Sequence, residues 1–296
     1  MKLVTYQHHA NISIGKVEGD LVIDLPLNDP TLPATMKELL QAGPEAMARA
    51  RAVRPGHAVA LAQVTLLAPL PNPSKYLAIG MNYRKHVAEA AKVGVQTPPA
   101  QVWFNKQVSC INGPFGDVHL PAVSNQLDYE VELCVVIGQR CRHVSREAAS
   151  AVIAGYMVCN DVSVRDWQLA TQTMTIGKSF DTCGPTGPWI VTPDELGDPL
   201  GLRLRMWVNG ELRQDDVTGA MIHDIYDQIA HLSTAFTLEP GDLLATGTPS
   251  GVGVAMSPPV YLKAGDVMRA EIEGIGSITN RVIAEPVRGG WATRTG

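Results

Sequence analysis

The fold of this chain is decided by the stretch 127-LDYEVELCVVIG-138. Its dense Tyr, Val and Ile content predicts a β-strand that ends at Gly138. Glu130 and Glu132 are two residues apart, so on a strand both carboxylates project from one face. Val131 and Leu133 then occupy the other face, and the apolar residues that follow argue against a solvated edge strand.

Two like charges side by side in an apolar strand repel each other and are costly to desolvate. A divalent cation removes both costs, and ligands that are all oxygen suit a hard ion such as Mg²⁺, Ca²⁺ or Mn²⁺. The alternative is a strand whose outer face meets water with two solvated glutamates. The Glu-x-Glu pair alone favours that alternative, so a metal site requires a third oxygen ligand in a matching context.

Composition excludes several classes of protein. With 296 residues, 45% hydrophobic and 18% charged, the chain is typical of a globular protein and not of a disordered one. The formal charge is −5 and no block of Lys or Arg is present, which argues against nucleic-acid and polybasic membrane binding. No apolar run reaches the roughly 18 residues of a membrane span, and the N-terminus lacks a signal-peptide pattern. We therefore expect a soluble, cytoplasmic protein.

The best domain boundary is the rigid connector 69-PLPNP-73. Residues 1–70 predict a small α+β domain, with three short strands followed by helices. Residues 71–296 contain many strand patterns and few helices, which predicts a β-rich main domain. The fold class expected is therefore α+β.

Two polar sites stand out in the main domain. His86 and Glu89 lie at i and i+3 of a predicted helix over residues 82–92, so they are neighbours on one helix face. A carboxylate in that position can orient an imidazole and raise its basicity, although an exposed polar helix face is the usual alternative. Asp161 follows an apolar strand predicted over 152–160, where an acid is either a ligand or a plain loop cap.

Three other features carry positive charge or can hold an anion. Arg165 and Gln168 lie at i and i+3 and face the same way. Lys178 stands in Gly-Lys-Ser, but no Gly precedes it at the P-loop spacing and no strand leads into it, so we reject a nucleotide site. The Gly-rich loop 247–253 could hold an anion through its backbone N–H groups, but no helix follows it, so phosphate is weakly supported.

Taken together, these segments resemble the fumarylacetoacetate hydrolase family. The resemblance extends in order from about Lys75 to Gly253 and rests on five segments, YLAIGMNYRKHVAEA, LDYEVELCVVIG, GYMVCNDVSVRDWQ, GKSFDTCGPTGPWIVTPDEL and PGDLLATGTPSGVG. It implies a mixed β-sandwich roll with a small N-terminal domain, a Mg²⁺ or Mn²⁺ ion, and a homodimer.

The resemblance also implies the metal ligands. By position these are Glu130, Glu132 and Asp161, which supplies the missing third ligand. The founding members of the family have a further acidic ligand upstream, whereas residues 77–82 of this chain contain no Asp or Glu. Water or substrate would complete such an open shell.

Carried over by position, His86 and Glu89 match the water-activating pair of the family, located on a helix that could act as a lid. The groups that match its oxyanion-binding and substrate-contacting positions are Arg165, Gln168, Lys178 and Thr248.

The expected substrate is a small-molecule 2-oxo acid, with no nucleic acid or membrane as partner. The expected reaction is metal-dependent hydrolysis of a C–C bond in a 2,4-dioxo acid of the acylpyruvate type, which gives pyruvate or a substituted pyruvate and a carboxylic acid. Decarboxylation of oxaloacetate-like acids and isomerase or lyase steps on 2-oxo dioates are the nearest alternatives. A non-catalytic metal-binding homologue is the alternative of another class.

Overall fold

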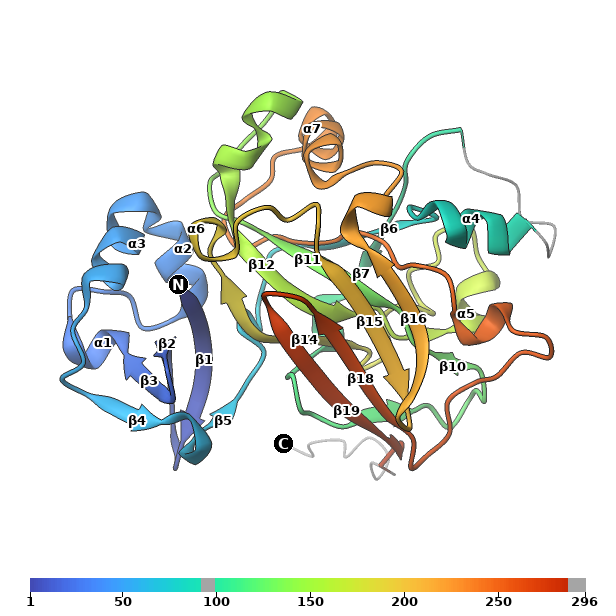
Figure 1. Cartoon of the computed structure of the whole chain (residues 1–296), viewed down its shortest axis with the longest axis horizontal. Coiled ribbons are helices and arrows are strands. Elements are labelled where there is room, and N and C mark those ends of the chain that lie inside the picture. Colours follow the sequence, from blue (N-terminus) through green and yellow to red (C-terminus); the bar gives the residue numbers. More distant parts are fainter. Residues whose placement is uncertain (92–98, 287–296) are drawn as a thin grey trace, which may run out of the picture.

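The computed structural model describes residues 1–91 and 99–286, and Figure 1 shows the chain as a β-rich body with helices at its periphery. The predicted β-rich α+β fold is confirmed. Lys92, the predicted end of the helix that carries His86, lies outside the described residues.

One large sheet runs through the molecule and includes strands from both ends of the sequence. Two short strands join its flanks, since β5 (Thr65–Leu66) pairs with β1 and β8 (Ile111–Asn112) pairs with β14. In spatial order its main strands are β4 (Ala58–Ala60), β3 (Leu21–Asp24), β2 (Asn11–Glu18), β1 (Lys2–His8), β14 (Gly184–Val191), β12 (Ile153–Asn160), β11 (Val131–Ile137), β17 (Leu243–Ala245), β6 (Tyr76–Gly80) and β7 (Val102–Lys106).

A five-stranded sheet packs against the large one. Its strands, in spatial order, are β16 (Glu211–Val217), β15 (Arg203–Val208), β18 (Val267–Ile272), β19 (Gly276–Ala284) and β9 (Val118–Leu120). A separate short ladder joins β10 (Leu127–Asp128) to β13 (Ser163–Val164).

The helices are short and lie outside the sheets. The longest, α7 (Ile225–Ala235), begins with a capping box in which Asp224 accepts from the N–H of Asp227. The other α-helices are α1 (Leu25–Asn28), α2 (Met36–Gln41), α3 (Gly43–Ala52), α4 (Arg84–Ala91), α5 (Arg165–Leu169) and α6 (Pro193–Leu196). The 3₁₀ helices within residues 1–91 and 99–286 are η1 (Leu61–Gln63), η2 (Val108–Cys110), η3 (Arg146–Val152), η4 (Thr218–Ala220) and η5 (Gly253–Ala255). Among the described residues, no helix has both the length and the apolarity that a membrane crossing requires.

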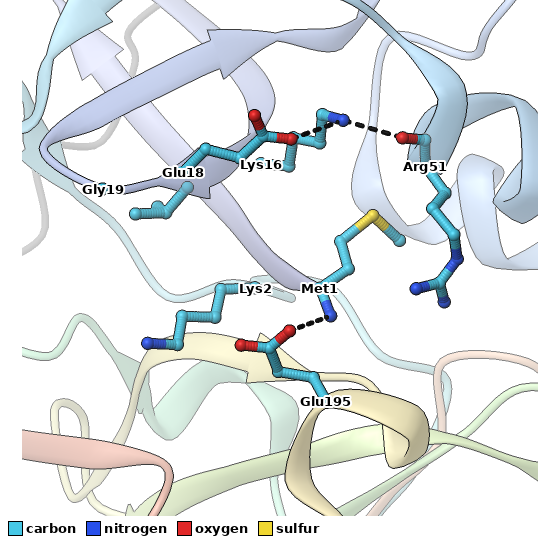
Figure 2. Close-up of a pocket in the computed structure, with 8 residues that line it drawn as sticks. Met1, Lys2, Lys16, Glu18, Gly19, Arg51 and Glu195 are labelled. Atoms are coloured by element: carbon cyan, nitrogen blue, oxygen red, sulfur yellow. Dashed lines mark hydrogen bonds and ion pairs between the residues drawn. The ribbon is translucent and has the colours of Figure 1, made fainter.

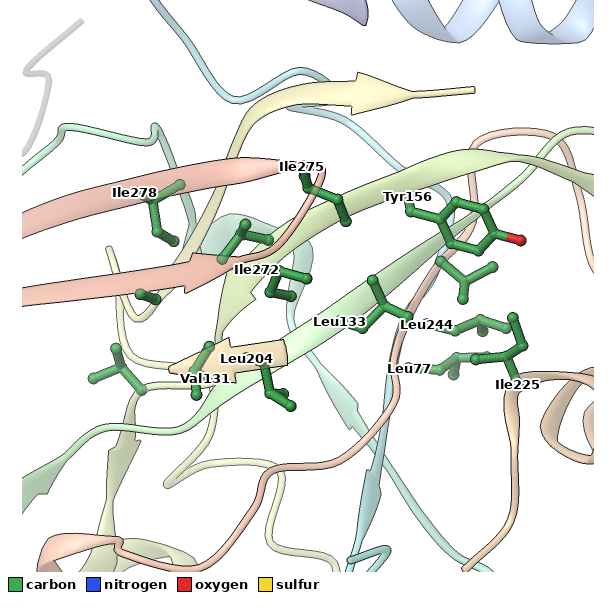
Figure 3. Packing of buried hydrophobic residues seen from close by; sticks show 14 of the residues in the cluster. Leu77, Val131, Leu133, Tyr156, Leu204, Ile225, Leu244, Ile272, Ile275 and Ile278 are labelled. Atoms are coloured by element: carbon green, nitrogen blue, oxygen red, sulfur yellow. The ribbon is translucent and has the colours of Figure 1, made fainter. Parts of the chain in front are cut away.

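The main hydrophobic core fills the space between the two sheets. Val131 and Leu133 of β11 contribute from one side, and Leu204 of β15, Ile272 of β18 and Ile278 of β19 contribute from the other (Figure 3). This is the face of β11 that alternation assigns to its odd-numbered residues. Its even-numbered residues, including Glu132, therefore point to the opposite face of the large sheet.

A second core lies on that opposite face, and it joins the N-terminal unit to the rest of the chain. It contains Leu3 and Leu39 from the first 70 residues together with Cys134, Met157 and Ile190 from the main body. The division at residue 70 remains a prediction, but the two parts share both a sheet and a core.

Polar contacts also cross between the two parts. The terminal amino group of Met1 donates to the hydroxyl of Thr192 at 2.8 Å and lies 3.1 Å from a carboxylate oxygen of Glu195. Figure 2 shows this amino group and Glu195 in a surface cavity of about 510 Å³, where Lys16 pairs with Glu18 and with the carbonyl of Arg51. These cationic groups are already paired within the protein. We therefore interpret this cavity as part of the contact between the first 70 residues and the rest of the chain.

The strand predicted over 127–138 is interrupted. β10 ends at Asp128, and β11 begins at Val131, so Tyr129 and Glu130 lie between two ladders. The N–H of Glu130 donates to the side-chain oxygen of Asn160 in β12 at 2.9 Å instead of to a backbone carbonyl of that strand. The break does not separate the carboxylates of Glu130 and Glu132.

Candidate active site and metal centre

Glu130, Glu132 and Asp161 converge because of the pairing of two antiparallel strands. The Cα partner of Glu132 in β12 is Cys159. Continuing this register past the strand ends places Asp161 opposite Glu130, and the N–H of Asp161 donates to the carbonyl of Glu130 at 2.9 Å. Opposite residues on antiparallel strands point to the same face. One oxygen of each carboxylate consequently lies within 4.8 Å of the others, and all three residues are buried.

Buried cations surround two of the three carboxylates. The Nζ atom of Lys178 lies 2.7 Å from an oxygen of Glu130 and 2.7 Å from an oxygen of Asp161. Arg165 pairs with the other oxygen of Glu130 at 2.8 Å, and Lys106 pairs with the other oxygen of Asp161 at 2.7 Å. Burial raises the pKa of Glu130, but Lys178 and Arg165 outweigh it and bring that pKa to about 2.

Glu132 differs from the other two acids. Its Oε2 atom accepts a hydrogen bond from the N–H of Gly247 at 2.8 Å, and no lysine or arginine of the described residues forms an ion pair with it. Burial, together with the negative charges of Asp161 and Glu130, raises its pKa well above the usual value. The three carboxylates are buried and close together, and Glu132 has no cationic side chain beside it among the described residues. Such a set of oxygen ligands fits a hard divalent ion.

His86 and Glu89 meet on α4 as their spacing predicts. The Nδ1 atom of His86 lies 3.2 Å from Oε2 of Glu89. An ionised carboxylate can only accept, so Nδ1 carries the proton and Nε2 is left as the basic nitrogen. The start of this helix is fixed by the buried Asn82, whose amide donates to the carbonyl of Thr246 at 2.7 Å.

The Gly-rich loop holds anions, as its backbone N–H groups predict, but the anions are carboxylates of the protein itself. Gly247 donates to Glu132, and Gly251 donates to both oxygens of Glu89 at 3.1 and 3.3 Å. Gly247 has a φ of +99°, and a Cβ there would lie 2.7 Å from the Cβ of Asn82, so a glycine is required. One loop therefore positions a candidate metal ligand and the partner of the candidate base.

The remaining predicted site residues lie at the same place. The guanidinium of Arg165 donates to Oε1 of Gln168 at 2.8 Å, which turns the Gln168 amide nitrogen toward Met174. The hydroxyl of Thr248 donates to the carbonyl of Val131 at 3.0 Å. The structure thus brings all nine predicted residues to one part of the molecule, while their roles remain predictions.

A cavity of about 380 Å³ opens beside this cluster. Polar residues that line it come from five separate segments and are His86, Glu130, Glu132, Arg165, Gln168, Lys178 and Thr248. The rest of its wall is formed by apolar side chains, among them Phe104, Leu169 and Met174. α4 and α5 both contribute and lie near each other in Figure 1.

Two residues of the cluster escaped sequence reasoning. Asp128 is fully buried and accepts from Nε of Arg165 at 2.9 Å and from the N–H groups of Gly253 and Val254 at 2.8 and 2.9 Å. Lys106 is also buried, and besides Asp161 it donates to the carbonyl of Lys178. The sequence offered two signals for these residues. Lys106 stands at the end of an apolar strand, and Asp128 lies just before the Glu-x-Glu pair.

Comparison with known proteins agrees with this site. The family model for the C-terminal domain of fumarylacetoacetate (FAA) hydrolase matches residues 75–283, which include every residue of the cluster. The chain belongs to the fumarylacetoacetate hydrolase family. The resemblance inferred from the five sequence segments is confirmed.

Relatives within the fumarylacetoacetate hydrolase family are named for different reactions. The oxaloacetate tautomerase fahd2, mitochondrial, of Xenopus laevis is 40% identical over 291 residues, covering 96% of this chain and 90% of its own length. The crystal structure of 2-hydroxyhepta-2,4-diene-1,7-dioate isomerase from Mycobacterium marinum matches with a TM-score of 0.77 and 34% identity, covering 96% of this chain and 99% of that one. Maleylpyruvate hydrolase from Sphingobium sp. SYK-6, in complex with manganese (II) ion and pyruvate, matches with a TM-score of 0.81 and 33% identity, covering 97% and 100%.

Proposed function

We propose that the chain is a divalent-metal-dependent enzyme that acts on a 2-oxo acid through its enolate, and that its main reaction is hydrolysis of a C–C bond in a 2,4-dioxo acid of the acylpyruvate type. The observation that carries this proposal is that Glu130, Glu132 and His86 line one cavity and that Glu89 contacts His86. A site that only bound an ion would have no use for an oriented base beside it.

The metal site would be formed by Glu130, Glu132 and Asp161. When bound, a divalent ion supplies a Lewis acid that can hold the carboxylate and 2-oxo oxygen of the substrate and stabilise enolate charge. Oxygen ligands suit Mg²⁺ and Mn²⁺ alike. Manganese is favoured by the maleylpyruvate hydrolase structure, which contains it.

The His86–Glu89 pair would activate water. Nε2 of His86 takes a proton from water as the oxygen attacks the 4-oxo carbon, and Glu89 stabilises the imidazolium that forms. The N–H of Gly251 keeps Glu89 in place during this step. His86 can then transfer this proton to C3, the substrate carbon that is released when the C3–C4 bond breaks.

Two further residues that line the cavity, Gln168 and Lys178, would stabilise the negative charge that develops on the substrate. The Gln168 amide nitrogen is turned toward the cavity wall, since its oxygen is held by Arg165. Lys178 is buried beside the carboxylates and presents a positive charge where the 2-oxo oxygen would lie.

The reaction balances without an oxidant or a reductant. Water adds to C4 of R–CO–CH₂–CO–COO⁻, the C3–C4 bond breaks with its electron pair on C3, and C3 takes a proton. The products are R–COOH, ionised at neutral pH, and pyruvate.

Keto–enol tautomerisation of oxaloacetate is the second candidate. It is favoured by the name of relatives that are 40–42% identical over most of their length, including the human FAHD2A protein at 42%. Moving a proton between C3 and the 2-oxo oxygen needs the same enolate and a base such as His86, but no attacking water. Decarboxylation or isomerisation of related acids would use the same enolate.

One panel of assays separates these reactions. Pyruvate release is measured from acylpyruvates and from oxaloacetate, and loss of the ultraviolet absorbance of enol-oxaloacetate is measured in parallel, each with Mg²⁺, with Mn²⁺ and with EDTA. Metal-dependent cleavage of acylpyruvates supports hydrolysis, and tautomerisation without cleavage supports the second candidate. Inactivity toward every acid would favour a non-catalytic binding protein. Light scattering of the same sample tests the homodimer that we propose.

A further inference from the structure

The cavity has a charged part and an apolar wall. Its polar lining residues belong to the hydrogen-bonded cluster described above, in which Lys178 and Arg165 each pair with Glu130. The rest of the wall is built from the side chains of Ile79, Met81, Val102, Phe104, Leu169 and Met174, together with small apolar residues.

The charge of the cluster limits the charge of its ligand. Its acids are Asp128, Glu130, Glu132 and Asp161, and its cations are Lys106, Arg165 and Lys178. With all four acids ionised and a divalent ion bound, this set would carry one positive charge, which balances one carboxylate of a substrate. Glu89, outside this set, adds a negative charge beside the cavity that disfavours a second substrate carboxylate.

We propose that the substrate is a 2-oxo acid with a single carboxylate and an extended apolar substituent, alkyl or aryl, that lies along the wall formed by Val102, Leu169 and Met174. The inference rests on the function proposed above and names its substrate class. It separates this chain from enzymes that act on dioates, since a second carboxylate packed against Val102, Leu169 and Met174 would lose hydration and gain no hydrogen bond from these apolar side chains.

Leu169 shows where the substituent would end. Its side chain lines the cavity, yet the residue is 73% exposed, so the apolar wall continues to the surface. A longer substituent would cover Leu169 and remove apolar area from water. Each added methylene should raise kcat/KM by about fourfold until the chain reaches solvent.

The experiment uses the full-length protein with Mn²⁺ and a series of 2,4-dioxo acids whose alkyl substituents have one, three and five carbons, plus one with a phenyl ring. Each alkyl acid is paired with an analogue that has a carboxylate in place of its terminal methyl group. Pyruvate release gives kcat/KM, and the shift in melting temperature with each acid gives a second readout that does not depend on turnover. We expect kcat/KM to rise with chain length and to fall at least about tenfold when the terminal carboxylate is present.

A charge placed on the wall provides the matched test. Leu169→Lys should narrow or reverse the preference for the apolar member of each pair, because it adds a cation at the mouth. Ile176→Lys is the control, since Ile176 is 53% exposed on the segment after α5 but does not line the cavity. The control should keep the wild-type preference.

The outcomes distinguish this inference from the function on which it rests. Cleavage with equal or higher kcat/KM for the dicarboxylic analogues, or for oxaloacetate, would overturn the apolar assignment and leave the enolate chemistry standing. If no acid is cleaved, the hydrolytic function fails, and the melting-temperature shifts decide the assignment. Larger shifts with the apolar acids then support it, and larger shifts with the dicarboxylic acids reject it.

Discussion

The N–H of Gly251 donates to both carboxylate oxygens of Glu89, at 3.1 and 3.3 Å. The same carboxylate faces Nδ1 of His86, so a backbone group of the Gly-rich loop fixes the orientation of the imidazole. Gly251 has a φ of +104°, and a Cβ there would lie 2.0 Å from the carbonyl oxygen of Arg213. The loop can therefore make this contact only with glycine at this position.

Removing the partner of the base should slow the reaction without affecting the metal. We expect both Glu89→Ala and His86→Ala to lower kcat by about 10²-fold or more, the former because the imidazole loses its orienting charge. Glu89→Gln keeps one accepting oxygen but not the charge, so its kcat should lie between those of Glu89→Ala and wild type. The measurements are kcat for pyruvate release and Mn²⁺ affinity by calorimetry, with the exposed Glu45→Gln as control. A Glu89→Ala variant with unchanged kcat would remove the pair from the mechanism.

Divalent ions should stabilise the fold through Glu132. We expect Mn²⁺ at about 100 times its Kd to stabilise the wild type by about 2.7 kcal/mol. In Glu132→Gln this gain should shrink, whereas the metal-free variant should melt no lower than wild type, because a neutral amide replaces a carboxyl group whose ionised form is disfavoured by burial and by Asp161 and Glu130. Thermal melts of both proteins with Mn²⁺ and with EDTA provide the test. Equal stabilisation by Mn²⁺ in wild type and Glu132→Gln would show that Glu132 is not a ligand of the ion.

Metal binding should depend on pH because of the same residue. The raised pKa of Glu132 means that the folded, metal-free protein holds a proton that the unfolded chain releases at lower pH. A divalent ion must displace that proton, so affinity should rise with pH, by up to about tenfold per pH unit while the proton is bound. Calorimetry in two buffers with different ionisation enthalpies should reveal proton release in wild type and little in Glu132→Gln. Affinity that is independent of pH from about 5 to about 8 would contradict the expectation.

Glu130 should stabilise the folded protein at neutral pH and lose this contribution in acid, because its pKa is lowered on folding whereas that of Glu132 is raised. The pKa of Glu130 falls from 4.5 to about 2 on folding, so the unfolded chain binds the proton first as pH decreases. The stabilisation is present above about pH 4.5 and is lost as pH falls toward 2. Metal-free wild type should therefore lose more stability than Glu130→Gln between about pH 5 and about pH 3. Denaturant melts of both proteins across this interval test the difference, and parallel curves would argue against it.

Lys106 should contribute to the free energy of unfolding, although it does not line the cavity. Lys106→Met leaves one oxygen of the buried Asp161 without its partner, and the expected cost is about 3 kcal/mol in the free energy of unfolding. Mn²⁺ should recover part of this loss by supplying a replacement positive charge. Lys75→Met is the matched control, since Lys75 pairs at 2.7 Å with the buried Asp242 but is itself partly exposed. A loss no larger than that of the control would show that Lys106 does not support the site.

Local pattern predicted most of the pieces of this site but not their assembly. Alternation placed Glu130 and Glu132 on one face, and helical spacing paired His86 with Glu89. The opposition of Glu130 and Asp161 depends on the register between β11 and β12, which a single sequence does not specify. Before the structure, only family resemblance joined these residues.

The supporting residues were harder to find, because their roles come from tertiary contacts. Asp128 looked like an ordinary strand residue, yet it accepts hydrogen bonds from Arg165 and from the backbone N–H groups of Gly253 and Val254 at the end of the Gly-rich loop. The break in the strand after Asp128 was also not predictable, since the N–H of Glu130 donates to the side-chain oxygen of Asn160 and not to a ladder carbonyl. Propensity reports the local backbone preference and not such distant partners.

The pairing of β1 with β14 has a practical consequence for anyone who shortens this chain. Lys2 and Leu3 are the partners of Val191 and Ile190, and Leu3 and Ile190 belong to the same core. A fragment that starts after the proline-rich connector would expose a bare strand edge next to uncovered aliphatic side chains, which is a template for self-association. Expression trials that aim for a minimal catalytic fragment should therefore yield aggregates, and retaining the first 70 residues should keep the preparation monodisperse.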